Sequence, residues 1–215
     1  MSPKFDKRMI DALRDRVGKE MSDFRFRHTL GVEKMAVKLG ELYCCDKIDV
    51  LRCAALLHDV TKELSLDEHI AIYKRFGLAP TTEELCAPAT LHSVTASLII
   101  PERYSDFADE EIIGAVRYHT VGRENMTLCE KLIYLADYID ETRAYDDCVA
   151  LREMFFSAEP EKMCENDRII HLMRVILRSF DMTVSDILKN GRVLSVETVK
   201  ARNGIIYELE NYERK

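Results

Sequence analysis

The sequence has 215 residues, of which 47% are hydrophobic and 32% charged, and its formal net charge at pH 7 is −7. This composition is typical of a globular protein and excludes a disordered or fibrous chain. The negative charge argues against a broad nucleic-acid surface, which needs clustered Lys and Arg, and no apolar run approaches the roughly eighteen residues of a membrane span.

Apolar residues recur at helical spacing along most of the chain, whereas no segment alternates apolar and polar residues over the length of a strand. Nine helices are therefore expected, approximately over residues 1–20, 24–43, 46–58, 66–77, 90–100, 109–119, 127–139, 160–190 and from 196 onward. There is no internal repeat, low-complexity tract or long linker. The sequence predicts an all-α fold in a single domain.

Local signals mark where several of these helices begin and end. Two capping boxes, Ser65–Glu68 and Thr127–Glu130, start the fourth and seventh helices. Asp46 is expected to be the N-cap of the third helix. Pro101 is expected to stop the fifth helix, and Pro160 fits the first turn of the eighth.

The cysteines and the N-terminal residues indicate the cellular compartment in which the protein is expected. The seven cysteines include no Cys-x-x-Cys pattern, which indicates free thiols in a reducing environment rather than disulfides or a thiolate zinc site. The first twenty residues interleave charged and apolar side chains, so they lack the uninterrupted apolar core of a secretion signal. The cytoplasm is therefore the expected compartment.

The most informative residues are His58 and Asp59, which directly follow the apolar third helix. A buried ionised Asp is costly unless it is paired or bound to a metal. His28, and Asp137 with its apolar neighbours, can supply further ligands. Imidazole nitrogens together with carboxylate oxygens suit Fe, Mn, Co or Zn. Each residue alone has an ordinary structural explanation, and only the joint pattern favours a metal site.

Five segments carry a resemblance to a known family, and they read RFRHTLGV (25–32), AALLHDVTKE (54–63), LHS (91–93), YHTVG (118–122) and LADYID (135–140) with Arg143. This order of His and Asp resembles the HD phosphohydrolase superfamily. More closely, it resembles the YqeK branch, the symmetrical diadenosine tetraphosphate hydrolases. The family segment commonly continues toward a Pro before the Arg, whereas this chain reads Asp140-Glu-Thr-Arg143.

The resemblance implies an HD-domain helical bundle with residues 25–145 as the metal-dependent phosphohydrolase core. Residues 1–24 would form a helix packed on that core, and residues 146–215 a helical extension of the same domain. It also implies an enzyme that cleaves diadenosine tetraphosphate to two ADP by attack of a metal-bound hydroxide on phosphorus.

The resemblance further implies a set of site residues. The metal ligands would be His28, His58, Asp59 and Asp137, with iron as the expected ion and Mn, Co or Zn as alternatives. Asp59 and Lys62 would be the catalytic residues, and Lys62 would also neutralise charge on the substrate.

His92 and His119 leave two alternatives open. They can complete a second metal site bridged by Asp59, so that one or two ions are bound, or they can donate hydrogen bonds to phosphate oxygens. The second alternative is favoured, because phosphate readily recruits His and no further carboxylate is evident in those segments. Further substrate contacts are expected from Arg25, Thr120, Arg123, Arg143, Arg174 and Arg178.

Other functions fit the same pattern. The chain can be an HD phosphohydrolase that acts on another nucleotide, or a sensor that binds a metal and a nucleoside diphosphate without turnover. The expected partner is a small dinucleoside polyphosphate or a nucleoside diphosphate, with no nucleic acid and no membrane. The Met and Phe stripes of the last third form core or the face of a homodimer.

Overall fold

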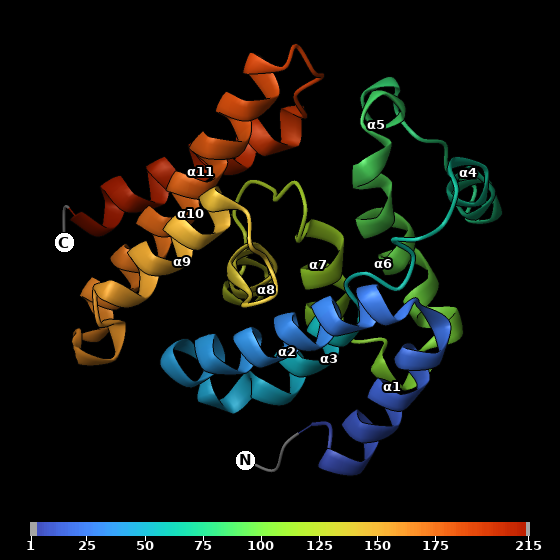
Figure 1. Ribbon diagram of the computed structural model, residues 1–215, viewed down its shortest axis with the longest axis horizontal. Coiled ribbons are helices and arrows are strands. Elements are labelled where there is room, and N and C mark those ends of the chain that lie inside the picture. The colour runs from blue at the N-terminus through green and yellow to red at the C-terminus, as the bar shows by residue number, and fades with distance from the viewer. Residues whose placement is uncertain (1–3, 214–215) are drawn as a thin grey trace.

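The computed structural model describes residues 4–213, and residues 1–3 and 214–215 of the predicted terminal segments lie outside it. Within residues 4–213 the secondary structure is entirely helical, which confirms the all-α prediction (Figure 1). The α-helices are α1 (Lys7–Glu20), α2 (Asp23–Tyr43), α3 (Ile48–Leu57), α4 (Leu66–Arg75), α5 (Thr82–Cys86), α6 (Leu91–Arg103), α7 (Glu110–Tyr118), α8 (Leu128–Ile139), α9 (Asp146–Ser157), α10 (Glu165–Lys189) and α11 (Val196–Glu213).

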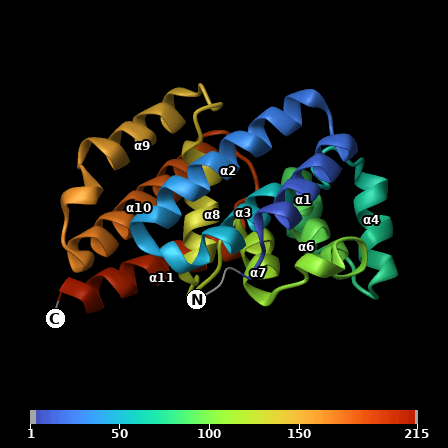
Figure 2. The same cartoon turned by 90° about the horizontal axis from the view of Figure 1, so that it is seen from below.

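Helices α2, α3, α7 and α8 pack against one another at the centre of the molecule (Figures 1 and 2). Helices α1, α4 and α6 lie on one side of this group, and α9, α10 and α11 lie on the other. The main hydrophobic core runs through all of these layers, from Phe5 beside α1 to Leu209 on α11, and a small second cluster of Tyr73, Leu91 and Val94 lies between α4 and α6. Because α9, α10 and α11 contribute residues to this core, the C-terminal helices pack directly on the central group.

Most helix-start signals act as the sequence predicts. The capping boxes at Ser65 and Thr127 are both formed, and Asp109 caps α7 by accepting from the N–H groups of Glu111 and Ile112. Each cap satisfies N–H groups that have no partner within the helix.

Three expectations about where helices begin or end are wrong: those for Asp46 and Pro101, and the one for Pro160 that is described next. Asp46 is not an N-cap, because a 3-10 turn over Cys45–Lys47 connects α2 to α3, which begins only at Ile48. Pro101 does not stop α6, which continues to Arg103. Proline fits helical φ, and so close to the helix end it removes only one backbone hydrogen bond.

Pro160 begins a 3-10 turn over Pro160–Lys162, and the long helix α10 starts only at Glu165 with Cys164 as its N-cap. Helices α5 and α9 were not among the predicted elements. No helix among the described residues is long and apolar enough to cross a membrane. Six of the seven cysteines are free thiols, and the side chain of Cys45 lies outside the described part.

Candidate metal centre

Six His and Asp side chains from five helical segments converge at the middle of the central group. They come from α2, from the turn after α3, from α6, from the end of α7 and from α8: His28, His58, Asp59, His92, His119 and Asp137. All except Asp137 are buried, and Asp137 is mostly so. The fold thus brings together the predicted metal ligands and the two additional histidines.

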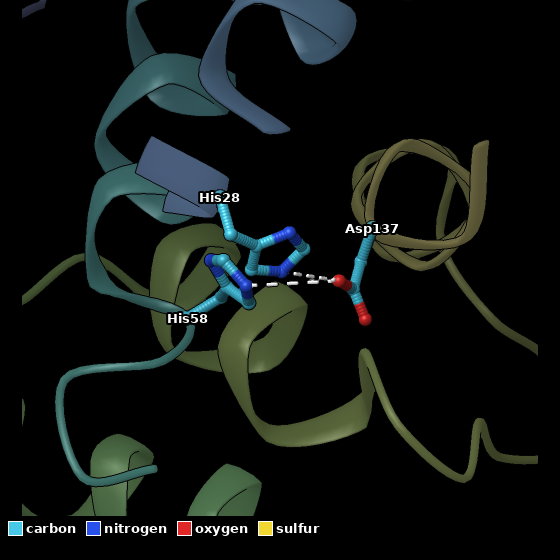
Figure 3. Close-up of side chains that lie close together, drawn as sticks. All are labelled: His28, His58 and Asp137. Carbon is cyan, nitrogen blue, oxygen red and sulfur yellow. Dashed lines mark ion pairs between the residues drawn. The ribbon is translucent and has the colours of Figure 1, made fainter. Parts of the chain in front are cut away.

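One group of ligand atoms forms between α2, α3 and α8. The Nε2 atom of His28 lies 2.9 Å from Oδ1 of Asp137, and Nε2 of His58 lies 3.8 Å from the same oxygen. Figure 3 shows both imidazoles facing the carboxylate of Asp137 on α8. The Oδ2 atom of Asp59 lies 3.3 Å from Nε2 of His58 and 3.7 Å from Nε2 of His28. These atoms can hold one cation between them.

A second group forms around the other oxygen of Asp59. Its Oδ1 atom lies 3.2 Å from Nε2 of His92 and 3.9 Å from Nε2 of His119, and these two nitrogens are 3.0 Å apart. The hydroxyl of Thr120 lies 3.2 and 3.1 Å from the same two nitrogens. Asp59 therefore faces a pair of imidazoles with each of its two carboxylate oxygens.

Three of these imidazoles are oriented in the same way by the backbone. In each, Nδ1 lies within hydrogen-bond distance of the carbonyl oxygen three residues earlier, at 2.6 Å for His58, 2.8 Å for His92 and 2.7 Å for His119. A carbonyl oxygen can only accept, so Nδ1 carries the proton. The lone pair of a neutral imidazole then lies on Nε2, which points into the centre as a metal ligand requires.

His28 is held by side chains instead. Its Nδ1 atom lies 3.4 Å from Oδ2 of Asp140 and 3.4 Å from the hydroxyl of Thr142. Asp140 is fully buried, and its Oδ1 atom accepts from the N–H of Thr142 at 2.8 Å. A carboxylate behind a histidine is a common way to orient a metal ligand. Asp140 lies in a segment that carries the family resemblance, whereas no sequence signal marks Thr142.

The donor set fits a divalent transition metal. The Nε2 atoms of His28 and His58 are buried and form no well-aligned hydrogen bond. Buried polar atoms without partners are rare, and these two nitrogens face the carboxylates of Asp59 and Asp137. Two neutral imidazoles and two carboxylates match the charge and the ligand preference of Fe, Mn, Co or Zn.

Charges in the centre keep both acids ionised. Burial alone would raise the pKa of Asp59, but the charge and N–H donors that His58 and His92 present when protonated hold that pKa well below its usual value. Burial of Asp137 is opposed in the same way, chiefly by the charge on Arg143 and a hydrogen bond from His28, so its pKa also lies well below the usual value.

His28 differs in protonation from His92 and His119. Burial disfavours the charged form of His28, yet hydrogen bonds with Asp137 and Asp140 raise its pKa to about 9. Burial lowers the pKa of His119 to about 3, and burial also lowers the pKa of His92. A proton on His28 thus balances the acids in the metal-free protein, and a bound cation would displace it.

Cationic side chains border the centre. Arg25 donates to Oδ2 of Asp59 at 2.7 Å, and Arg143 donates to Oδ1 of Asp137 at 2.5 Å. The ammonium group of Lys62 lies 3.2 Å from Nδ1 of His92, and burial lowers its pKa. A cavity of about 640 Å³ opens beside Arg25 and Arg143.

The remaining predicted arginines lie apart from this cluster. Arg123 forms a two-point ion pair with Glu130, at 2.9 and 3.0 Å. Arg174 and Arg178 are exposed on α10, and neither lines the cavity beside the centre. Their role in substrate binding stays a prediction.

Comparisons with known proteins agree with this geometry. The family model for the HD domain matches residues 25–142. A symmetrical bis(5'-nucleosyl)-tetraphosphatase of Bacillus subtilis is 29% identical over 88% of this chain and 94% of that protein. The enzyme of the same description from Staphylococcus aureus is 34% identical over 66% of this chain and 72% of its own.

A solved structure shares the fold over nearly its whole length. It is described as a predicted HD superfamily hydrolase involved in NAD metabolism from Clostridium acetobutylicum. It is 30% identical in sequence and superposes with a TM-score of 0.79, covering 92% of this chain and 97% of that one. These matches confirm the resemblance drawn from the sequence, and the chain belongs to the HD domain family.

Proposed function

We propose that this protein is a metal-dependent hydrolase that cleaves diadenosine tetraphosphate symmetrically into two molecules of ADP. The observation that carries the proposal is the placement of Asp59 between two pairs of imidazoles, with Lys62 beside one pair. The names of the Bacillus and Staphylococcus relatives supply the substrate. The reaction consumes one water and breaks the P–O bond between the two middle phosphates.

The proposed ligands of the first ion are His28, His58, Asp59 and Asp137, with iron as the expected metal. A divalent metal held there would supply Lewis-acid activation of water and of a phosphoryl oxygen. Asp59 and Asp137 are each fixed by an arginine, so their ligand oxygens are already oriented.

For His92 and His119 the geometry supports the alternative of a second ion bridged by Asp59. A neutral imidazole with its proton on Nδ1 has no proton on Nε2 to donate to a phosphate oxygen. Moreover, two Nε2 lone pairs 3.0 Å apart repel each other unless a cation lies between them and the carboxylate. Elemental analysis of the wild type and of His92→Ala tests this proposal, since the variant should lose one of two ions.

Lys62 and Thr120 lie beside His92, where both side chains can contact the substrate. The ammonium group of Lys62 is partly buried, so it can neutralise charge that develops on the phosphoryl oxygens in the transition state. The hydroxyl of Thr120 can donate to a phosphate oxygen. Arg25 and Arg143 reach from the carboxylates toward the cavity, where further phosphate oxygens would lie.

Product analysis tests the reaction. The purified protein with added Mn²⁺ or Fe²⁺ should convert diadenosine tetraphosphate to ADP alone. Release of AMP and ATP in equal amounts, or unaltered substrate across several metals, would contradict the proposal.

Lys62→Ala separates an enzyme from a sensor. In an enzyme, kcat should fall about a hundredfold with a smaller change in KM, because the ammonium group stabilises mainly the transition state. The exposed Lys200 provides the matched control, and Lys200→Ala should leave both constants unchanged. If the wild type shows no turnover and Lys62→Ala only weakens ADP binding, the protein is a sensor.

A further inference from the structure

The cavity beside the centre has a strongly cationic wall. Its volume is about 640 Å³, within the usual range for a small-molecule site. Four of its lining residues carry or can carry positive charge, namely Arg25, Arg27, His28 and Arg143, and none of its lining residues is acidic. In a chain with a net charge of −7, such a wall indicates a binding site for a polyanion.

Two exposed aromatic rings line the same cavity. Phe24 is 69% exposed in the first turn of α2, and Tyr145 is 72% exposed at the N-terminal end of α9. Both lie outside the hydrophobic core, so core packing does not explain them. Single exposed aromatic residues are common, but two on one cationic wall offer a stacking surface for a nucleotide base.

Among the three arginines of this wall, Arg27 is the one that the described residues leave without an acidic partner, so it can pair with a ligand. Arg25 and Arg143 are paired with Asp59 and Asp137. Arg27 donates only to the carbonyl of Asp23 within its own helix, at 3.3 Å, and has no ion pair with a residue in the described part of the chain. Its guanidinium is exposed and can donate hydrogen bonds to a phosphate group in the cavity.

The residues of the cavity wall become more exposed from the metal centre outward. His28 is 7% exposed at the centre, Arg25 and Arg143 are half-buried, and Phe24 and Tyr145 lie at the rim. A nucleoside diphosphate has the same order, with its terminal phosphate at one end and its base at the other. The cavity therefore matches one half of a dinucleoside tetraphosphate in charge, size and polarity.

We propose that this cavity binds one nucleoside diphosphate half of the substrate, with the base on Phe24 and Tyr145 and the phosphate next to the ribose on Arg27. The proposal rests on the proposed function, since it assumes cleavage at the adjacent centre. It implies that the second half of the substrate extends past Lys62, on the opposite side of Asp59.

Binding of ADP and of inorganic pyrophosphate to the Mn²⁺-loaded protein, measured by titration calorimetry, tests this pocket without requiring turnover. Phe24→Ala and Tyr145→Ala should each weaken ADP binding about tenfold and leave pyrophosphate binding unchanged, because only ADP has a base to stack. Arg27→Gln should weaken both ligands severalfold. Tyr207→Ala and Arg8→Gln, at exposed positions outside the cavity, are the matched controls and should match the wild type.

The outcomes separate this pocket from the proposed reaction. If diadenosine tetraphosphate is hydrolysed but neither aromatic variant changes ADP affinity, the pocket is refuted and the reaction stands. If the variants weaken pyrophosphate as much as ADP, the base does not bind there and the proposal is also refuted. Selective loss of ADP affinity supports the pocket, even if hydrolysis of the dinucleotide fails.

Discussion

The orientation of His28 depends on Asp140, a residue outside the proposed ligand set. Oδ2 of Asp140 lies 3.4 Å from Nδ1 of His28 and 3.5 Å from Nε of Arg143. One buried carboxylate thus positions both a ligand and the arginine that fixes Asp137. Without its charge, neither contact is maintained at full strength.

We expect Asp140→Asn to weaken metal binding by about 10- to 100-fold, the usual effect of losing a group behind a metal ligand. Competition with a chromophoric chelator measures the affinity directly. Glu141→Gln is the matched control, because Glu141 is exposed and pairs with Lys34 and Lys38 away from the centre. Wild-type affinity in Asp140→Asn would show that the contact is only structural.

The six His and Asp residues that the fold brings together could be recognised in the sequence, because their order along the chain resembles that of a known family. The groups behind them are not visible. The carbonyls that orient His58, His92 and His119 depend on where each helix ends, and any residue type supplies a carbonyl. His69 is likewise buried against Thr95 because α4 packs on α6, a contact that the local sequence does not show.

At the scale of elements, α2 approaches the loop after α8 at a glycine. A Cβ atom on Gly31 would lie 2.7 Å from Oδ1 of Asp140 and 2.8 Å from Cγ2 of Thr142. Contacts this short force one of the segments to move. The absence of a side chain at Gly31 therefore lets α2 and this loop place His28 against Asp140.

Gly31→Ala should destabilise the protein by about 1–3 kcal/mol and weaken metal binding, since the loop that holds His28 is displaced. Chemical denaturation and metal titration measure the two effects. Gly204→Ala on α11 is the control, because its new Cβ would meet nothing closer than 3.6 Å. That variant should gain up to about 1 kcal/mol from helix propensity. Normal metal affinity in Gly31→Ala would contradict this account.

Long amphipathic helices could be predicted from the sequence, and short or weakly patterned ones could not. Helix α5 has only five residues, too few for a period to show, and its capping box at Thr81 is the one local signal. Helix α9 carries an apolar stripe of Cys148, Leu151 and Phe155, but the exposed Met154 obscures it. Both elements take their place mainly from packing on their neighbours.

At the scale of the whole molecule, the centre joins helices that are distant in the chain. Its side chains come from α2, α6 and α8 and from the ends of α3 and α7, the same helices that surround the core. A cation held by His28, His58, Asp59 and Asp137 would connect three helical segments, and a second one at His92 and His119 would connect two more through Asp59. Because the unfolded chain has no such arrangement, binding energy at the centre contributes directly to the free energy of unfolding.

Metal should therefore raise the melting temperature. At an ion concentration a hundred times Kd, binding adds about 2.7 kcal/mol, which for a chain of this size is a shift of roughly 5–10 °C. Differential scanning fluorimetry with Mn²⁺, followed by excess chelator, should show the shift and its reversal. His171→Ala, which removes a histidine bonded to the carbonyl of Phe155, should keep the shift. Asp137→Asn should lose most of it, and an equal shift in both variants would place the stabilising ion elsewhere.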